Sequence, residues 1–245
     1  MVSVLILLAL VAAACSSGTE TGATAERVDD GAEETAATTA TGPAETTLVI
    51  EPEVVAEPRV DPVPGVLASL STEEKIGQLL MPTLFGQGAT VSGNDATLNQ
   101  AAHGAADPTD IVAQHHLGGI IYLEDNIDSA QQVRAMSREL QDAALADSGI
   151  GLLVAVDQEG GRVSRLSDEM SLFPPAQTMA GDAELVRETN YVTGQQVQQQ
   201  GVNVVLAPVA DVIDPASPSF INDRSFGADP AVVATMVGAA VDGLQ

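Results

Sequence analysis

Residues 152–166 read LLVAVDQEGGRVSRL, an apolar run that ends at Asp157 in a polar loop with glycines and arginines. A run that is apolar on both faces predicts a buried parallel strand. In barrels and open α/β sheets, binding and catalytic residues follow the carboxyl ends of such strands. Asp157 occupies that position, so we expect the functional site to lie here.

The loop after this strand has side chains suited to the hydroxyl groups of a sugar. Asp157 and Glu159 carry carboxylates that accept hydrogen bonds from neighbouring hydroxyls. Arg162 and Arg165 donate in a planar fork. The alternative is that Asp157 caps the next helix while the arginines pair with nearby acids. The residues of the loop alone leave both interpretations open.

The composition argues against several kinds of partner. The chain has 245 residues, with 34 acidic and 9 basic side chains and a net charge of −25. Nucleic-acid binding is therefore not expected, because phosphate contacts need Lys and Arg. Cys15 is the only cysteine, which excludes an internal disulfide and a cysteine-based metal cluster. We expect no nucleic-acid partner, no metal and no cofactor.

The first 15 residues have the pattern of a secretion signal. Residues 1–14 are apolar and end in small residues before Cys15, although no Lys or Arg precedes them. The pattern resembles a bacterial lipobox, in which the cysteine is lipidated and tethers the protein to a membrane. A plain cleaved signal and an uncleaved anchor are the alternatives. The lipobox predicts a secreted lipoprotein on the extracytoplasmic face of a bacterial cell membrane.

The rest of the chain divides by composition into a linker and a folded domain. Residues 16–64 are rich in Ala, Thr, Glu, Gly and Pro and lack a periodic apolar face. Such a segment buries too little apolar surface to offset its chain entropy, so it is expected to be disordered. Residues 65–245 form the predicted domain.

Strands and helices alternate along this domain. Ser71 and Glu74 fit a capping box at the start of the first helix. Polar residues at 86–108 predict a long surface loop. Apolar runs predict four strands, at 81–85, 119–123, 152–156 and 202–207. Apolar periodicity and capping residues predict helices that end near 117, begin after Asp128 or Ser129, span 183–200 and begin after Asp229.

This α/β alternation specifies a parallel sheet with right-handed crossovers. The pattern leaves a closed barrel and an open doubly wound sheet as the choices. About four strand–helix units are present, half of an eightfold barrel.

Six stretches resemble the family 3 glycoside hydrolases, and within them the bacterial β-N-acetylhexosaminidases of lipoprotein type. They cover nearly all of 70–245 and read STEEKIGQLLM, HHLGGIIYLEDNI, VAVDQEGGRVSRL, FPPAQTMAG, GVNVVLAPVADV and RSFGADP. The resemblance implies a (β/α)8 TIM barrel, of which about the first four units are present. It also implies removal of terminal β-linked N-acetylglucosamine with retention of configuration, with peptidoglycan or cell-wall fragments as substrates.

The resemblance assigns roles to individual residues. Asp157 and Arg165 match family residues that hold the sugar hydroxyls in the terminal subsite, and Arg224 matches a third. Glu159 and Arg162 are expected to brace the loop.

One part of the family pattern has no match in the chain. The family's Lys-His pair, its Gly-His-Gly motif with a His-Asp acid/base dyad and its aspartate nucleophile are expected beyond Gln245. The only lysine is Lys75, and His103, His115 and His116 all precede the loop that begins at Asp157. A retaining glycosidase needs a nucleophile and an acid/base about 5 Å apart. We therefore expect an amino-terminal fragment with no catalytic residues of its own.

Paired acids near strand ends are the only substitutes for that machinery, Asp157 with Glu159 or Asp211 with Asp214. Such acids are usually caps or hydrogen-bond acceptors. A metal role for His115 and His116 is not expected.

Two other functions are compatible with the sequence. One is a β-glucosidase or another family 3 specificity. The other is a sugar-binding lipoprotein without catalysis, built from half a barrel. Half a barrel exposes two sheet edges and an apolar interior, which favours aggregation unless two copies pair.

Overall fold

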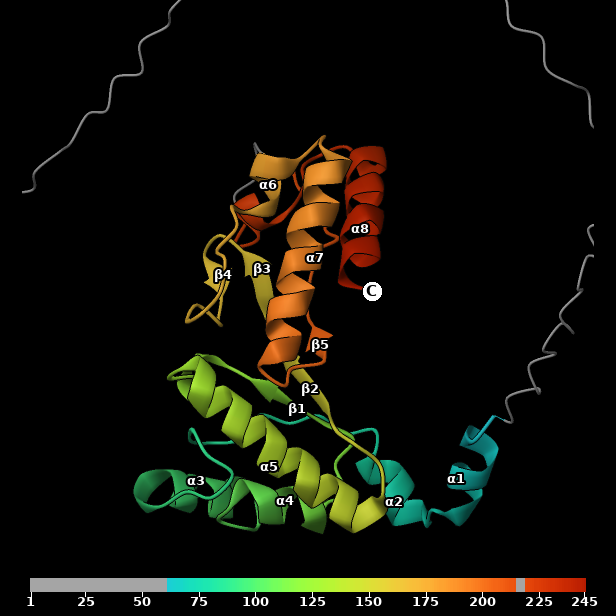
Figure 1. Ribbon diagram of the computed structural model, residues 1–245, viewed down its shortest axis with the longest axis vertical. Coiled ribbons are helices and arrows are strands. Elements are labelled where there is room, and N and C mark those ends of the chain that lie inside the picture. The colour runs from blue at the N-terminus through green and yellow to red at the C-terminus, as the bar shows by residue number, and fades with distance from the viewer. Residues whose placement is uncertain (1–60, 215–218) are drawn as a thin grey trace, which may run out of the picture. The chain divides into compact units, whose positions relative to one another are not determined.

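The computed structural model describes residues 61–214 and 219–245 (Figure 1). The predicted signal, Cys15 and the linker up to residue 60 lie outside these residues, and the expectations about them stay predictions. Helix α1 begins at Val63, two residues before the predicted domain boundary. Pro62 and Pro64 suit this position, because the fixed φ of proline fits the first turn of a helix.

The described elements alternate between helices and strands. The helices are α1 Val63–Ser69, α2 Thr72–Gly77, α3 Gly93–His103, α4 Pro108–Gln114, α5 Ala130–Ser148, α6 Ala176–Met179, α7 Ala183–Gln199 and α8 Pro230–Leu244. The strands are β1 Gly119–Tyr122, β2 Leu153–Val156, β3 Gln158–Gly160, β4 Val163–Ser164 and β5 Val204–Val205. Two short 3-10 helices are η1 Glu124–Asn126 and η2 Asn222–Arg224. In this part of the chain, no helix is both long enough and apolar enough to cross a bilayer.

Strands β1, β2 and β5 form a parallel sheet in that order, which confirms the predicted mixed α/β class. Tyr122 pairs with Val156, and Val156 pairs with Val205. The carboxyl ends of the three strands therefore meet at one edge of the sheet. The loop that begins at Asp157 follows β2 at that edge and forms the antiparallel hairpin β3–β4.

Two groups of buried apolar side chains hold the elements together. One joins β1 and β2 to α4 and α5, and includes four apolar residues of α5 at three- and four-residue steps: Val133, Met136, Leu140 and Ala144. The other lies among α6, α7 and α8, where α7 and α8 run side by side (Figure 1). The apolar periodicity of α5 and α8 is thus confirmed as a buried face.

The predicted strand at 81–85 is wrong, because no ladder forms there. Gly119 donates to the Leu80 carbonyl at 3.2 Å, and Ile121 donates to the Pro82 carbonyl at 3.0 Å. Pro82 has no N–H to complete the ladder, so the segment accompanies β1 without pairing as a strand.

The predicted loop at 86–108 is also wrong in its middle, where α3 forms. Helix α3 ends at His103, and Gly104 caps it with a positive φ of 83° that closes the last turn. Asn99 is the only buried residue of α3. The helix therefore lacks the apolar period on which the prediction depends. Strand β5 is shorter than the predicted 202–207.

Candidate functional site

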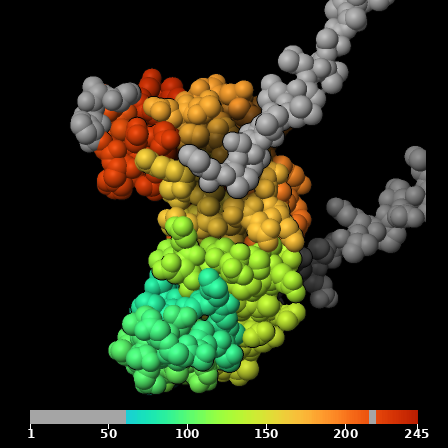
Figure 2. Space-filling view, turned by 90° about the vertical axis from the view of Figure 1, so that its left-hand side faces the viewer, coloured from blue at the N-terminus to red at the C-terminus, as the bar shows by residue number. Residues whose placement is uncertain are grey.

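Asp157 lies directly after β2, at the carboxyl edge of the sheet, and is partly buried. Figure 2 shows the face of the molecule that carries the hairpin after it, coloured yellow. The backbone N–H of Arg165 donates to the Asp157 carbonyl at 3.4 Å, which brings the two ends of the hairpin together. Because a strand and not a helix follows Asp157, the helix-capping alternative is wrong.

The base of the hairpin is closed by the buried side chain of Gln158. Its amide donates to the Leu166 carbonyl at 2.9 Å, and its Oε1 accepts from the Leu166 N–H at 3.0 Å. These bonds satisfy a buried amide with backbone groups of the same loop. The hairpin therefore has a fixed base from which Asp157 and Arg165 extend.

The two glycines of the hairpin allow the FPPA stretch to pack against it. A Cβ on Gly160 would lie 2.8 Å from the Pro174 carbonyl oxygen, and one on Gly161 would lie 2.8 Å from the Pro175 Cβ. Gly161 also donates to the Phe173 carbonyl at 2.8 Å. Both glycines have positive φ. Glycine is needed here for conformation and for close approach.

The strongest polar contact of the site joins Glu159 to Arg224. The guanidinium binds both carboxylate oxygens, Nε to Oε2 at 2.7 Å and Nη2 to Oε1 at 2.6 Å. This hydrogen bonding raises the pKa of Arg224, and the charges of Asp157 and Asp211 add to the effect. The two hydrogen bonds therefore hold the guanidinium of Arg224 in a fixed orientation, and its charge interacts with that of Asp157.

Arg162 makes a second link between the hairpin and η2. Its Nη2 donates to the carbonyls of Phe220 at 2.6 Å and Ile221 at 2.9 Å, and lies 3.5 Å from the Asp223 carboxylate. Arg162 and Glu159 thus hold the loop against η2, as the sequence predicts for bracing residues.

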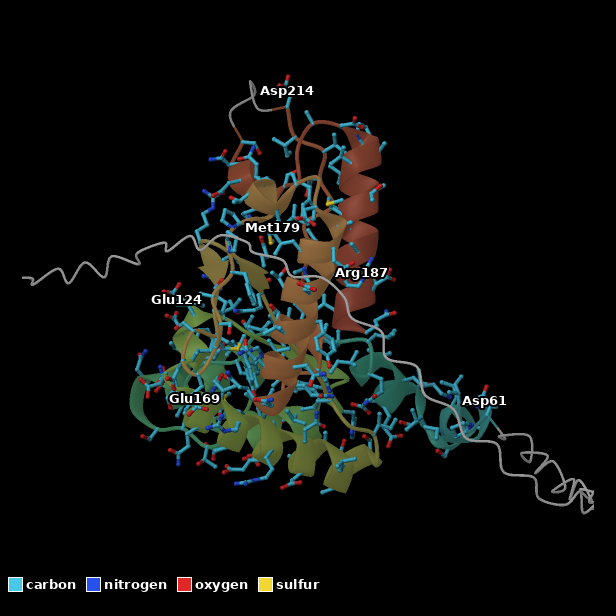
Figure 3. All side chains as sticks on the ribbon, turned by 45° about the horizontal axis from the view of Figure 1, so that its top comes forward. Asp61, Glu124, Glu169, Met179, Arg187 and Asp214 are labelled. Atoms are coloured by element: carbon cyan, nitrogen blue, oxygen red, sulfur yellow. The ribbon has the colours of Figure 1, made fainter. Side chains whose placement is uncertain are left out.

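Arg165 has a weaker partner. Its Nη1 lies 3.3 Å from Glu124 Oε2, and the Glu124 side chain is 84% exposed. Figure 3 shows Glu124 on the same side of the molecule as the hairpin. The Arg165 Nε is buried without a hydrogen-bond partner among residues 61–214 and 219–245. An exposed ion pair of this kind contributes little stability and exchanges readily for a ligand.

The arginines therefore do pair with acids, as the alternative interpretation predicts. Within the described part of the chain, however, no side chain donates a hydrogen bond to the Asp157 carboxylate. That carboxylate and the exposed pair of Arg165 leave binding capacity for a ligand. Glu124, the partner of Arg165, was not predicted, although its place at the end of β1 was the signal that could have found it.

The other titratable candidates lie elsewhere. His115 and His116 precede β1, at the opposite edge of the sheet from Asp157. The hydrogen bond from His116 Nδ1 to Asp147 Oδ2, 2.8 Å long, raises the pKa of this histidine. In the ranges that the structure describes, no three His, Cys, Asp or Glu side chains gather as a metal site would require.

The fold and the site together define an α/β protein with paired carboxylates and guanidinium groups at the carboxyl ends of parallel strands, which is where enzymes of the TIM-barrel type have their active sites. Residues 71–245 match the glycosyl hydrolase family 3 N terminal domain, and the chain belongs to this family. The resemblance of the six stretches is thereby confirmed.

Named relatives agree with this assignment. The beta-hexosaminidase LpqI of Mycobacterium tuberculosis is 31% identical over 240 residues, which cover 97% of this chain and 52% of that protein. A family 3 beta-N-acetylglucosaminidase from Paenibacillus sp. is 34% identical with a TM-score of 0.61, over 72% of this chain and 31% of that one. A family 3 glycosyl hydrolase from Mycobacterium smegmatis is 35% identical with a TM-score of 0.55, over 73% and 48%. The chain spans about half the length of LpqI.

Proposed function

We propose that the protein is an exo-acting, retaining glycoside hydrolase that removes terminal β-linked N-acetylglucosamine, with peptidoglycan or cell-wall fragments as substrates. The observation that carries this proposal is the placement of Asp157, Arg165 and Arg224 at one edge of the sheet in a family 3 chain. The names of the relatives, beta-hexosaminidase and beta-N-acetylglucosaminidase, support the choice of sugar.

In this proposal the residues of the chain bind the terminal sugar. The Asp157 carboxylate accepts hydrogen bonds from two neighbouring hydroxyls, and the guanidinium groups of Arg165 and Arg224 donate to hydroxyl oxygens. Glu159 fixes the fork of Arg224 and binds no sugar itself. We assign no nucleophile and no acid/base to residues 1–245.

The barrel is part of the same proposal. Strands β1, β2 and β5 lie in chain order, and helices follow them. This order supports an arrangement in which 65–245 supplies about the first four units of a TIM barrel, after a signal at 1–15 and a linker at 16–64. The lipobox at Cys15 supports a lipid-anchored protein at the extracytoplasmic face of a bacterial membrane. Mass spectrometry of the mature amino terminus tests the anchor, because lipidation adds acyl chains to Cys15 and Cys15→Ser removes them.

Titration with N-acetylglucosamine tests the binding proposal. Loss of a carboxylate that accepts hydroxyl bonds weakens binding by roughly tenfold to a hundredfold. We therefore expect Asp157→Ala to raise the Kd for N-acetylglucosamine by this factor in calorimetry. Asp142→Ala, on the exposed surface of α5, is the matched control and should leave the Kd unchanged. An equal Kd for Asp157→Ala and the unaltered chain would remove Asp157 from the site.

Glucose in the same titration tests the β-glucosidase alternative. A Kd for glucose equal to or lower than that for N-acetylglucosamine would favour this alternative. A clear preference for N-acetylglucosamine would support the proposed sugar.

A further inference from the structure

A cavity of about 760 Å³ lies next to the candidate sugar site. Its lining residues come from three segments: 83–88 after α2, 90–98 before and within the start of α3, and 123–126 at the end of β1. Its size falls within the range of about 300–1,000 Å³ that is usual for ligand pockets. Neither the family match nor any residue role assigned above accounts for it.

The lining combines apolar and polar groups. Phe85, Leu98 and Leu123 are each nearly two-fifths exposed, at 39%, 38% and 39%. Polar side chains lie on the same lining. Within the described ranges, four of them form no hydrogen bond to another residue: Ser92, Asn94, Asp95 and Asp125. A pyranose ring has an apolar C–H face and a rim of hydroxyls, so it requires both kinds of contact.

Two buried asparagines fix the wall of the cavity at 84–86. The Asn99 side chain is fully buried, accepts from the Phe85 N–H at 2.9 Å and donates to the Phe85 carbonyl at 3.0 Å. The Asn126 amide donates to the carbonyls of Leu84 at 2.7 Å and Gly86 at 2.9 Å. Burying an amide is unfavourable unless it is fully bonded, and here its bonds hold an irregular segment in one conformation.

The short helix η1 connects the cavity to the sugar site. Glu124 pairs with Arg165 of the site, and the next residue, Asp125, lines the cavity. Tyr122 pairs with Val156, so Leu123 and Asp157 leave adjacent strands, whose backbones lie about 5 Å apart. The cavity thus begins one strand away from the Asp157 carboxylate.

We propose that this cavity is a second carbohydrate subsite, which binds the sugar ring on the other side of the scissile bond from the terminal N-acetylglucosamine. Phe85, Leu98 and Leu123 contact the apolar face of the ring, and Asp95 and Asp125 accept bonds from its hydroxyls. This inference rests on the proposed function, because it takes the terminal sugar to lie at Asp157.

Binding of a monosaccharide and of a disaccharide by the full chain tests the subsite. The probes are N-acetylglucosamine and its β-linked disaccharide with sulfur in place of the bridging oxygen, which resists hydrolysis. The unaltered chain is expected to bind the disaccharide about tenfold more tightly, as one or two additional hydrogen bonds would give. Leu98→Ala and Asp125→Asn should each reduce this advantage about fivefold and leave the monosaccharide Kd unchanged.

Two control variants on the exposed surface of α5 match these substitutions. Leu145→Ala and Asp142→Asn remove the same groups away from the cavity, and neither Kd should change. Equal affinity of the unaltered chain for the two probes overturns the subsite. The subsite is also overturned if the cavity variants leave both Kd values unchanged, or if they raise both Kd values by the same factor. If neither probe binds the unaltered chain, the proposed function fails and the subsite fails with it. Monosaccharide binding that depends on Asp157, without a disaccharide advantage, refutes the subsite alone.

Discussion

The ion pair between Glu159 and Arg224 should stabilise the fold, and Glu159→Gln tests this. The substitution keeps the volume of the side chain but removes its charge and one of the two acceptors of Arg224. A hydrogen bond to a charged group contributes about 1.5–3 kcal/mol. The Glu159 side chain is 7% exposed and that of Arg224 is 21% exposed, so partial screening favours the lower end of this range.

We therefore expect Glu159→Gln to reduce the free energy of unfolding by about 2 kcal/mol, from one bond lost and one weakened. For a domain of this size, such a loss lowers Tm by roughly 4–8 °C. Thermal unfolding of the full chain, followed by circular dichroism, measures the change. When Arg224→Gln is added to Glu159→Gln, the additional decrease in the free energy of unfolding should be smaller than the decrease that Arg224→Gln causes in the unaltered chain. The reason is that the two residues interact directly, so their effects are not additive.

Glu184→Gln is the matched control for this experiment. Glu184 pairs with Arg187 along α7, but these side chains are 67% and 43% exposed. An exposed pair of this spacing contributes less than about 0.5 kcal/mol, so Tm should hardly move. If Glu159→Gln behaves like Glu184→Gln, the pair does not hold the hairpin to η2 and the reasoning is refuted.

Three further substitutions test other parts of the structure. Gly161→Ala should lower Tm by several degrees in thermal unfolding, because a residue at φ 58° with its Cβ 2.8 Å from Pro175 costs about 1–3 kcal/mol; an unchanged Tm would contradict the close packing. Asn99→Ala should reduce the free energy of unfolding in urea by about 2–4 kcal/mol, because the three hydrogen bonds of the buried Asn99 amide to backbone groups are lost. A loss below about 1 kcal/mol, roughly the value of one ordinary hydrogen bond, would refute this role. The contact with Asp147 raises the pKa of His116 above its usual 6.5, so its stabilising effect is fully present below about pH 6.5 and is lost as pH rises through the folded-state pKa. Asp147→Asn should flatten this pH dependence in urea unfolding, and an unaltered profile would assign the dependence to other groups.

The sequence predicted correctly those features that depend on residues close together along the chain. The capping box is present as predicted, with Ser71 accepting from the Glu74 N–H and Glu74 accepting from the Ser71 N–H. Ser129 and Asp229 cap their helices through bonds to residues only two or three positions away. Such contacts form from local sequence alone, so local patterns predict them.

The predictions failed where a distant partner decides the structure. Segment 81–85 has the apolar residues of a strand, but Pro82 prevents a complete ladder with β1. Helix α3 has no apolar face, and its buried residue is Asn99, which bonds to Phe85 and Ala106. A search for apolar periodicity cannot detect a helix whose only buried side chain is the hydrogen-bonded amide of an asparagine.

For the site, position along a strand was enough to single out Asp157 as a candidate, whereas the acid that pairs with each arginine was not predictable. Glu159 and Arg224 are 65 residues apart, and no local pattern links a carboxylate to a guanidinium over that distance. The bracing role of Glu159 came from the family resemblance, and its partner came only from the structure. The pairing of Glu124 with Arg165, 41 residues away, was missed for the same reason, although the place of Glu124 at the end of β1 marked it as a candidate.

These pairings give a physical reason why the stretches DQEGGRVSRL, FPPA and RSFG occur together. Gly160 and Gly161 accept the close approach of the FPPA prolines, which requires both stretches at once. Glu159 would be a buried carboxylate without a partner if Arg224 were lost, and such a charge is strongly destabilising. Replacing either glycine or one partner of this ion pair therefore leaves a clash with another stretch or an unpaired charge in it. The three stretches act as one scaffold that holds Asp157 and Arg224 at the same edge of the sheet.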